Sequence, residues 1–429
     1  MVKSDSLGKF VFANTNTEVV GSVLYQQHLK LIEKNRFAEF AGYLMPLWFS
    51  SISAEHSAVR ESAGLFDCTH MGVLEFTGPH ALSFLNAITT NDIDRLKDGC
   101  AQYSYILDAA GFVLDDIIVY RRSEDKFMVV VNAANEPKIK AYLKALLHGK
   151  AAVDIENPNR KLGDKPVIRD MRDSNSGPDC RVDIALQGPE SVELLNTIIK
   201  DKKTKELLQD LKSFHLIETE LGGLDCIISR TGYTGSKNGF ELFVHPEKAT
   251  ELWNMLLDKG KSLGVVPCGL GARDSLRIEA GLPLYGHELD GEFDISPFEA
   301  GYGWAVKLEK DFFIGQEPIR KKAQGRNMQV ARIELPGQKG IRPARQHDGV
   351  LDEKGICIGW VLSCAGVGDK QIALVYISKE NAEENQTVGL YYLARSKSQV
   401  EKGKKEKVEK NEKLEPDISG KVATRFVKF

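Results

Sequence analysis

Residues 103–132 read YSYILDAAGFVLDDIIVYRRSEDKFMVVVN, and this stretch decides the fold of the chain around it. It holds two runs of β-branched and aromatic residues, 117–120 and 127–131, separated by a short polar turn, a pattern that predicts a β-hairpin. Asp115 and Asp116 lie where the first strand begins, and because side chains alternate across a strand we expect them on opposite faces. One carboxylate should therefore face inward, where it is either hydrogen-bonded structure or a group kept for chemistry.

Outward from the hairpin, helical and strand patterns alternate without a regular repeat. The sequence predicts helices at 22–35, 53–63, 78–88, 137–147, 190–200, 249–259 and 271–280, and strands at 72–76, 182–186, 226–229 and 240–244. Ser53 is the expected cap of the second helix. Residues 157–180 are rich in Pro, Gly, Asp and Arg and are expected to form an inserted loop. The combination indicates an α+β fold, and neither a doubly wound sheet nor a barrel of eight units.

Beyond Lys321 the pattern changes to short strands separated by glycine and aspartate. They lie at 330–335, 357–362, 372–377 and 388–394, which is typical of a small antiparallel β domain, expected to span 326–429. Within it, 396–415 is almost entirely Lys, Glu, Ser, Gly and Asn, and we interpret it as an insertion that forms either a solvated helix or a disordered loop. Residues 422–429 alternate again and are expected to return as the closing strand.

The composition limits which classes of protein the chain can belong to. Lys and Arg (57) nearly balance Asp and Glu (60) over 429 residues, so the net charge of −3 offers no long-range attraction for nucleic acid or anionic lipid. No apolar run approaches the length of a membrane span. The seven cysteines show no CxxC spacing and are expected to be reduced thiols. The N-terminal residues lack signal-peptide and transit-peptide character, so we expect a cytoplasmic protein with no membrane or nucleic-acid partner.

The common catalytic motifs do not account for the chain. It contains no Walker loop, dinucleotide fingerprint, HExxH or nucleophile elbow, and its histidines show no ligand spacing. Taken singly, Asp116, Glu241 and Arg273 would each be ordinary, since Glu241 lies in a strand position that is usually solvated and Arg273 lies in a charged helix pattern. From the residues alone, the chain is an α+β enzyme or binding protein with a polar cleft.

Eight segments that follow one another in a set order carry a resemblance. They are FAGYLMPLW at 40–48, LFDCTHM at 65–71, VLDDIIVY ending at 120, VVNAAN at 130–135, LQGP at 186–189, RTGYTG at 230–235, GARDSLRIEAGLPLYGHEL at 271–289 and PFEAGYGWAVK at 297–307. Together they resemble the T-protein family of the glycine cleavage system, the folate-dependent aminomethyltransferases. The family's S-G-x-x-S-P pattern is replaced by Ser-Cys-Ala-Gly at 363–366, which leaves a substrate contact there open.

The resemblance implies a three-lobed α+β fold around a cavity for tetrahydrofolate, with two intertwined α+β lobes over 20–320 and a small C-terminal antiparallel β-barrel. It also implies a reaction with the aminomethyl-lipoyl arm of a small carrier, H-protein. The one-carbon unit of that arm passes to tetrahydrofolate, ammonia is released and 5,10-methylenetetrahydrofolate forms. Tetrahydrofolate is then a co-substrate, and none of these steps needs a metal.

The same resemblance assigns roles to particular residues. Asp116 matches the family's catalytic aspartate, which accepts a proton or stabilises positive charge as the C–N bond to ammonia breaks. Glu241 suits the pterin, whose ring N–H and amino group present two parallel donors to a carboxylate. The remaining folate-binding residues are Met71, Tyr103, Tyr120, Asn132, Tyr233, Trp304 and Arg273, the last placed there either to meet the folate's glutamate or to orient Glu241.

Three other functions compete with this assignment. The strongest is a tetrahydrofolate-dependent demethylase acting on a small methylated sulfur, nitrogen or oxygen compound with the same fold. The second is the non-catalytic folate-binding family that assists iron–sulfur and tRNA maturation, whose hallmark is the cysteine of K-G-C-x-x-G-Q-E. The corresponding stretch, 310–317, reads KDFFIGQE and has Phe312 in place of that cysteine, which disfavours this function. A structural protein is least favoured, because it would not need Asp116, Glu241 and Arg273 together.

Overall fold

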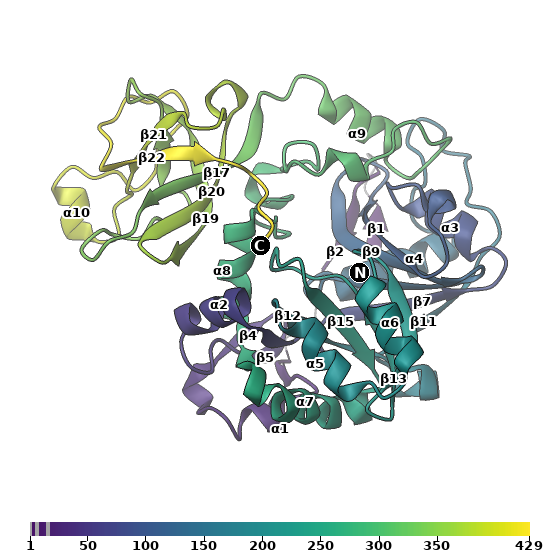
Figure 1. The fold of residues 1–429 in the computed structure, drawn as a ribbon. Coiled ribbons are helices and arrows are strands. Elements are labelled where there is room, and N and C mark those ends of the chain that lie inside the picture. The colour runs from purple at the N-terminus through teal and green to yellow at the C-terminus, as the bar shows by residue number, and fades with distance from the viewer. Residues whose placement is uncertain (1, 5–7, 14–17) are drawn as a thin grey trace. The chain divides into compact units, whose positions relative to one another are not determined.

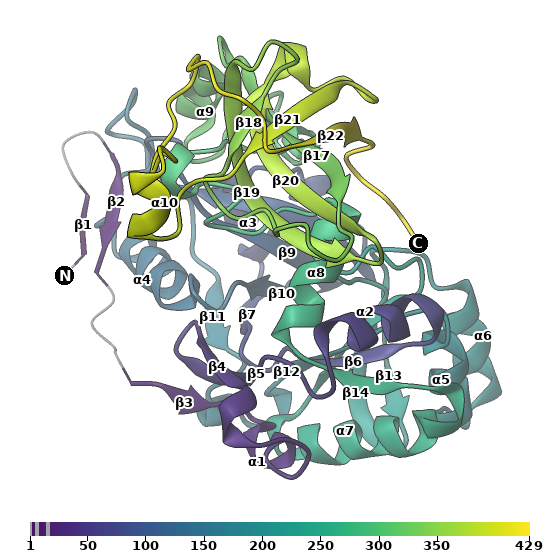
Figure 2. The ribbon, with the colours of Figure 1, turned by 90° about the vertical axis from the view of Figure 1, so that its left-hand side faces the viewer.

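The computed structural model describes residues 2–4, 8–13 and 18–429. By its internal contacts the chain forms two units. Unit 1 comprises Met1–Gly232, Ser236–Ala272 and Ala305–Lys322, and unit 2 comprises Tyr233–Gly235, Arg273–Trp304 and Ala323–Phe429. Figures 1 and 2 show the elements of both units in two views. Among the described helices, none is long and apolar enough to cross a lipid bilayer.

The predicted hairpin lies in a five-stranded antiparallel sheet of unit 1. In spatial order the strands are β11 (Val167–Asp170), β7 (Gly72–Thr77), β10 (Lys126–Val131), β9 (Val113–Ser123) and β8 (Cys100–Leu107). Strands β9 and β10 pair in register with Val131 opposite Ile117, which confirms the hairpin. The prediction that residues 157–180 form a loop is wrong at Val167–Asp170, where β11 forms. That strand escaped prediction because an ion pair stabilises it, with Arg169 Nε 2.9 Å from Oε2 of the buried Glu75 on β7.

Both faces of this sheet are buried. One face packs under α3 (Ala81–Ile88) and α4 (Glu136–Leu147), where Ile117 and Val119 join a single apolar cluster. The opposite face carries Tyr120, which clusters with side chains of a second sheet. Because side chains alternate along β9, Asp115 belongs to the helix-covered face and Asp116 to the face that looks toward the second sheet.

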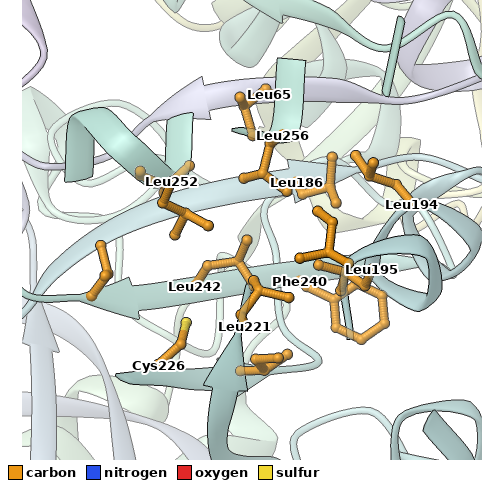
Figure 3. Close-up of a cluster of buried hydrophobic side chains, with 14 of the residues drawn as sticks. Leu65, Leu186, Leu194, Leu195, Leu221, Cys226, Phe240, Leu242, Leu252 and Leu256 are labelled. Atoms are coloured by element: carbon orange, nitrogen blue, oxygen red, sulfur yellow. The ribbon is translucent and has the colours of Figure 1, made fainter. Parts of the chain in front are cut away.

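The second sheet of unit 1 has six strands. Their order is β13 (Leu216–Leu221), β14 (Leu224–Ser229), β15 (Gly239–Val244), β12 (Val182–Gln187), β6 (Gly64–Asp67) and β16 (Val266–Cys268), with β16 parallel to β6 and the other neighbours antiparallel. Helices α5 (Ser191–Ile198) and α7 (Pro246–Gly260) cover one face, and Figure 3 shows Leu195 and Leu252 in the apolar cluster there. The other face carries Phe243 and meets the five-stranded sheet.

Two polar elements of this sheet region were not predicted. Helix α6 (Lys202–Asp210) has the sequence KKTKELLQD, and of its side chains only Leu208 is buried. Strand β13 alternates Glu218 and Glu220 with less polar residues. Neither segment shows the apolar face by which surface elements are usually recognised, so their formation depends on the packing of neighbouring strands and helices.

The N-terminal part of unit 1 departs from its prediction. Residues 22–35 form only α1 (Tyr25–His28) and a 3-10 turn at Lys34–Arg36 instead of one helix. The chain wraps around the buried Asp67, whose Oδ2 lies 2.6 Å from Ser22 Oγ and 2.8 Å from His28 Nε2. Helix α2 (Ile52–Glu61) is capped by Ser51 instead of Ser53. The remaining strands of this part are β1 (Val2–Ser4), β2 (Phe10–Phe12), β3 (Val20–Gly21), β4 (Phe37–Phe40) and β5 (Tyr43–Pro46).

Unit 2 contains a closed antiparallel barrel, which confirms the predicted C-terminal β-barrel. Its strands, in spatial order, are β17 (Met328–Pro336), β20 (Lys370–Ser378), β19 (Cys357–Val367), β18 (Gly349–Leu351), β21 (Thr387–Tyr391) and β22 (Ile418–Ala423). Alternate residues fill its interior, among them Ile333, Val361 and Leu390. Helix α8 (Leu270–Ala280) contributes most of its length to the same unit. The α+β fold class is therefore confirmed.

The charged run at 396–415 folds against this barrel. Its helical part is α10 (Lys397–Glu401), and the following residues turn back so that Val408 is buried beside Leu351. The carbonyl of Val408 accepts a hydrogen bond from Trp360 Nε1 at 2.9 Å. The run is thus neither a long solvated helix nor a disordered loop, and its one buried valine is the signal that the surrounding charge obscured.

The chain returns to the barrel after this run, as expected, but earlier than predicted. Strand β22 pairs with β17 and β21 and closes the barrel, and it ends at Ala423. The last residues leave the barrel and bind elsewhere in unit 2. The backbone N–H of Val427 donates to the carbonyl of Ala280 at 3.1 Å, and that of Phe429 to the carbonyl of Gly235 at 2.9 Å.

Lys310 has a structural role in unit 1, shortly before α9 (Gln316–Ala323). Its Nζ donates to the carbonyls of Asn86, Thr89 and Asn91 at 2.6, 2.8 and 2.8 Å, and so closes the turn that follows α3. Phe312, which replaces the cysteine of the folate-binding family, packs against the apolar cluster of the five-stranded sheet.

We expect Lys310→Met to lower the free energy of unfolding by about 2–4 kcal/mol, because three carbonyls lose a charged donor. Urea denaturation followed by circular dichroism would measure this. Lys307→Met is the matched control, since the Lys307 ammonium makes no hydrogen bond to a residue that the structure describes, and it should change stability by less than about 0.5 kcal/mol. Equal stability of the two variants would contradict the structural role.

Candidate active site

A β-bulge presents the two adjacent aspartates of β9. Asp116 pairs with Tyr105 of β8 and Asp115 with Ile106, but the next pair joins Val113 to Leu107, so Leu114 is an extra residue without an opposite partner. A bulge bends its strand and re-aims the neighbouring side chains. The expectation that one of the two carboxylates faces inward is confirmed for Asp115, which is fully buried, whereas Asp116 is half-buried on the opposite face.

Asp116 is half-buried and is bound from two elements. The Tyr103 hydroxyl of β8 donates to its Oδ2 at 2.9 Å, and Nδ2 of Asn132 lies 2.8 Å from its Oδ1. Burial raises the pKa of Asp116, while the hydrogen bonds from Tyr103 and Asn132 act in the opposite direction. Such an acid holds its proton to a higher pH than an exposed aspartate does.

Asp115 is fully buried and accepts three N–H bonds. Its Oδ2 accepts from the backbone N–H of Asn132 at 2.9 Å, and its Oδ1 accepts from Nδ2 of Asn132 at 2.8 Å and Nδ2 of Asn135 at 2.6 Å. Burial and then the charge of Asp116 raise the pKa of Asp115. A single amide nitrogen, Nδ2 of Asn132, thus reaches both carboxylates and couples their titration.

Glu241 projects from β15 on the face that looks toward the five-stranded sheet, and it is 9% exposed rather than solvated. Its Oε2 accepts from the Tyr120 hydroxyl at 2.8 Å and from the Thr231 hydroxyl. No residue within the described ranges donates to Oε1. Burial and the charge of Glu241 raise the pKa of Tyr120 well above its usual value, so the phenol keeps the proton that it donates.

Tyr120 connects the two acids within unit 1. It lies on the same face of β9 as Asp116, four residues further along, which places the two Cα atoms about 13 Å apart at the usual rise per residue. Its hydroxyl meets Glu241 across the layer between the sheets. Met71 packs at the edge of the same layer, against the cluster that contains Tyr120. Six of the nine predicted site residues therefore belong to unit 1: Met71, Tyr103, Asp116, Tyr120, Asn132 and Glu241.

The other three predicted residues belong to unit 2. The Arg273 guanidinium lies 5.1 Å from the centroid of the Tyr233 ring, and the Tyr233 hydroxyl donates to the carbonyl of Pro283 at 2.5 Å. Trp304 is 53% exposed, with its ring centroid 5.8 Å from that of Tyr302. Arg273 and Tyr233 are thus in contact, and Trp304 offers a large exposed aromatic surface.

Sequence reasoning missed two residues that hold this site together, Thr231 and Asn135. Thr231 lies in the segment RTGYTG and Asn135 in VVNAAN, but the sequence of these segments does not indicate which side chain points toward an acid. At 363–366, Ser363 serves structure, because its Oγ accepts from Nη2 of the buried Arg277 at 2.9 Å. Among the described residues, no group of three His, Cys, Asp or Glu side chains is arranged to hold a metal ion.

Comparison with known proteins places the chain in a family. A family model described as the GCVT N-terminal domain matches residues 24–310, and an aminomethyltransferase of Halalkalibacterium halodurans is 39% identical over 363 residues, 84% of this chain and 89% of that relative. The chain belongs to the aminomethyltransferase family. An aminomethyltransferase of Desulfitobacterium hafniense strain Y51 is 40% identical over 375 residues, 87% of this chain and 93% of the relative.

A solved structure of the aminomethyltransferase family supports the same assignment. The glycine cleavage system aminomethyltransferase T of Bartonella henselae is similar with a TM-score of 0.73 and 28% identity, covering 95% of this chain and 99% of that one. The resemblance drawn from eight sequence segments is therefore confirmed, and with it the enzyme class, a transferase. The roles of individual residues stay predictions.

Proposed function

We propose that this aminomethyltransferase acts in the glycine cleavage system, moving the one-carbon unit of the aminomethyl-dihydrolipoyl arm of H-protein to tetrahydrofolate. The observation that carries the proposal is the pair of acids in one inter-sheet layer of unit 1. Asp116 is held between Tyr103 and Asn132, and Glu241 is held by Tyr120 and Thr231 with one oxygen uncommitted.

The reaction balances without an oxidant or a metal. The S–CH2 and CH2–N bonds of the carrier arm break, and two new N–CH2 bonds form on tetrahydrofolate. The two N–H protons that tetrahydrofolate loses go one to the departing amine, which leaves as ammonia, and one to the carrier sulfur, which becomes a thiol. When bound, tetrahydrofolate supplies the two amines that take the one-carbon unit. The protein then has to hold the folate, place the carrier arm beside it, and transfer protons to the leaving amine and from the folate amines.

Glu241 is the proposed anchor for the pterin edge. A buried carboxylate with one oxygen uncommitted fits a ligand that brings N–H donors, and the pterin presents a ring N–H and an amino group side by side. Because Oε2 already accepts from Tyr120 and Thr231, we infer that Oε1 receives the ligand's donors. Tyr120 and Thr231 then act as positioning residues that fix the carboxylate plane.

Asp116 is the proposed catalytic residue. Its pKa is raised by burial, so it keeps its proton to a higher pH than an exposed aspartate does, and Tyr103 and Asn132 fix where its two oxygens point. The proposed roles are to protonate the leaving amine and to take back a proton from a folate amine. Met71 would line the same layer.

The residues of unit 2 complete the proposal. Tyr233 and Trp304 are proposed to stack on the folate rings, and Arg273 either to meet the folate's glutamate or to orient Glu241. We also propose that residues 20–320 act as one catalytic region and 326–429 as a separate barrel domain. The enzyme would work in the cytoplasm with lipoylated H-protein as a partner, and with neither nucleic acid nor a membrane.

The decisive experiment offers the enzyme two kinds of donor. Lipoylated H-protein carrying the aminomethyl group, mixed with tetrahydrofolate, should give one ammonia and one 5,10-methylenetetrahydrofolate per arm. Small methylated amines, sulfides and ethers should give neither product above background. Methyl transfer from a small donor together with no ammonia from H-protein would favour the demethylase and contradict the proposal.

A further inference from the structure

The amide of Asn132 has more acceptors than hydrogens. Its Nδ2 lies 2.8 Å from Oδ1 of Asp115, 2.8 Å from Oδ1 of Asp116 and 3.1 Å from the backbone carbonyl of Asp116, but an amide carries two hydrogens. These three oxygens also identify this end of the side chain as the nitrogen. At any moment one of the three contacts is therefore not a hydrogen bond.

The partners of the two acids differ in kind. All three groups around Asp115 are N–H donors, namely the backbone and side chain of Asn132 and the side chain of Asn135. A protonated Asp115 would have to aim its O–H at one of these donors. Asp116 instead faces the Tyr103 hydroxyl, which accepts a hydrogen bond as readily as it donates one. A proton on Asp116 thus has a partner, and a proton on Asp115 has none among these groups.

Two neighbouring carboxylates in a water-poor site do not both ionise easily, so the pair holds one proton over a wide pH range. Resting on the proposed function, we propose that Asp115 is a positioning residue: it remains the anion of the pair, keeps the shared proton on Asp116, and fixes the Asn132 amide that orients Asp116. Asp116 thereby enters the reaction as an acid, ready to protonate the departing amine.

Among the residues of unit 1 that the structure describes, no other charged side chain forms a hydrogen bond or ion pair with the two carboxylates. The groups that face it are the Tyr103 phenol from β8 and the amides of Asn132 and Asn135 from the turn between β10 and α4. On α4, Lys140 is bound to Glu136 and to Asp170 of β11. Burial raises the pKa of both carboxyls, and the charge of Asp116 raises the pKa of Asp115 further. The geometry of the hydrogen-bond partners described above, and not these pKa shifts, assigns the proton to Asp116.

The test is the pH profile of kcat/KM for loaded H-protein. If Asp116 must carry a proton, wild-type activity falls as pH rises through the pKa of the pair. Asp115→Asn removes the repelling charge, so this alkaline limb should move down by at least about one pH unit, and kcat at pH 7.5 should fall about tenfold with little change in KM for tetrahydrofolate.

A second variant moves the limb the other way. Asn135→Ala removes one donor from the Asp115 anion but keeps both carboxylates, so the pair should hold its proton more strongly and the limb should move up. This variant keeps the inference testable even where Asp115→Asn folds poorly. Opposite displacements of the two variants are not expected from a merely structural role.

Asp108→Asn is the matched control, in the turn between β8 and β9 of the same sheet. Asp108 is also buried, its pKa is also raised by burial, and it accepts backbone N–H bonds from Phe10, Ala110 and Phe112 at 3.0 Å each. It should leave the alkaline limb where it is. An Asp115→Asn enzyme with the wild-type limb would overturn the inference and leave the proposed function standing. An active Asp116→Ala enzyme would contradict the proposed function itself.

Discussion

Replacing Asp116 by alanine or asparagine is expected to lower turnover with loaded H-protein by about 100- to 10 000-fold, the usual contribution of a positioned acid or base. Tetrahydrofolate binding should stay largely intact, because the proposed pterin anchor is Glu241, whose partners Tyr120 and Thr231 do not contact Asp116. Single-turnover ammonia release measures the chemical step, and isothermal titration calorimetry measures the folate affinity.

Asp125→Asn is a suitable comparison for this variant. Asp125 lies exposed in the turn of the same hairpin, between β9 and β10, so the substitution removes a carboxylate from the element without touching the inter-sheet layer. Its turnover should equal that of the wild type within about twofold. Unchanged ammonia release in either Asp116 variant would remove this residue from its proposed role.

Glu241→Ala should weaken tetrahydrofolate binding by about 10- to 100-fold, as expected when a ligand loses hydrogen bonds to a charged acceptor worth about 1.5–3 kcal/mol. The loss has a second component, because the Tyr120 hydroxyl, whose raised pKa keeps it protonated, is left without its acceptor. Calorimetric titration with tetrahydrofolate in the absence of H-protein isolates this effect from catalysis.

Two further variants sharpen the result. Glu241→Gln keeps one acceptor oxygen but loses the charge, and its affinity should lie between those of the alanine variant and the wild type. Glu220→Ala removes an exposed glutamate from β13 of the same sheet and should bind folate normally. Wild-type affinity in Glu241→Ala would refute the proposed anchor.

The elements that could be predicted are those with a strong apolar period. The hairpin of β9 and β10, helices α4 and α7, and the barrel strands β17, β19, β20 and β21 were visible because each buries a continuous apolar face. The helix predicted at 22–35 is wrong for the opposite reason. Their leucines suggested a helix, but the buried acid Asp67 binds Ser22 and His28 and fixes a different backbone path.

The site shows the same limit at the level of single residues. Alternation along β9 correctly separated Asp115 from Asp116, and it indicated that burial would make one of them unusual. It gave no sign of the extra residue at Leu114, because a bulge depends on how two strands align. Likewise, the anchoring of Glu241 by Thr231 depends on a turn whose course is set by the surrounding structure. The domain boundaries at 320 and 326 stay predictions.

The uneven use of the two oxygens of Glu241 has a consequence for inhibitors. Under the proposed binding mode, Oε1 meets only the aminopyrimidinone edge of the pterin, and that edge is the same in oxidised and reduced folates. Glu241 should therefore bind oxidised and reduced folates alike. The redox state of the folate matters only beside Asp116, where the reaction requires the amines of the reduced form. Folic acid and other fully oxidised analogues should consequently act as competitive dead-end ligands.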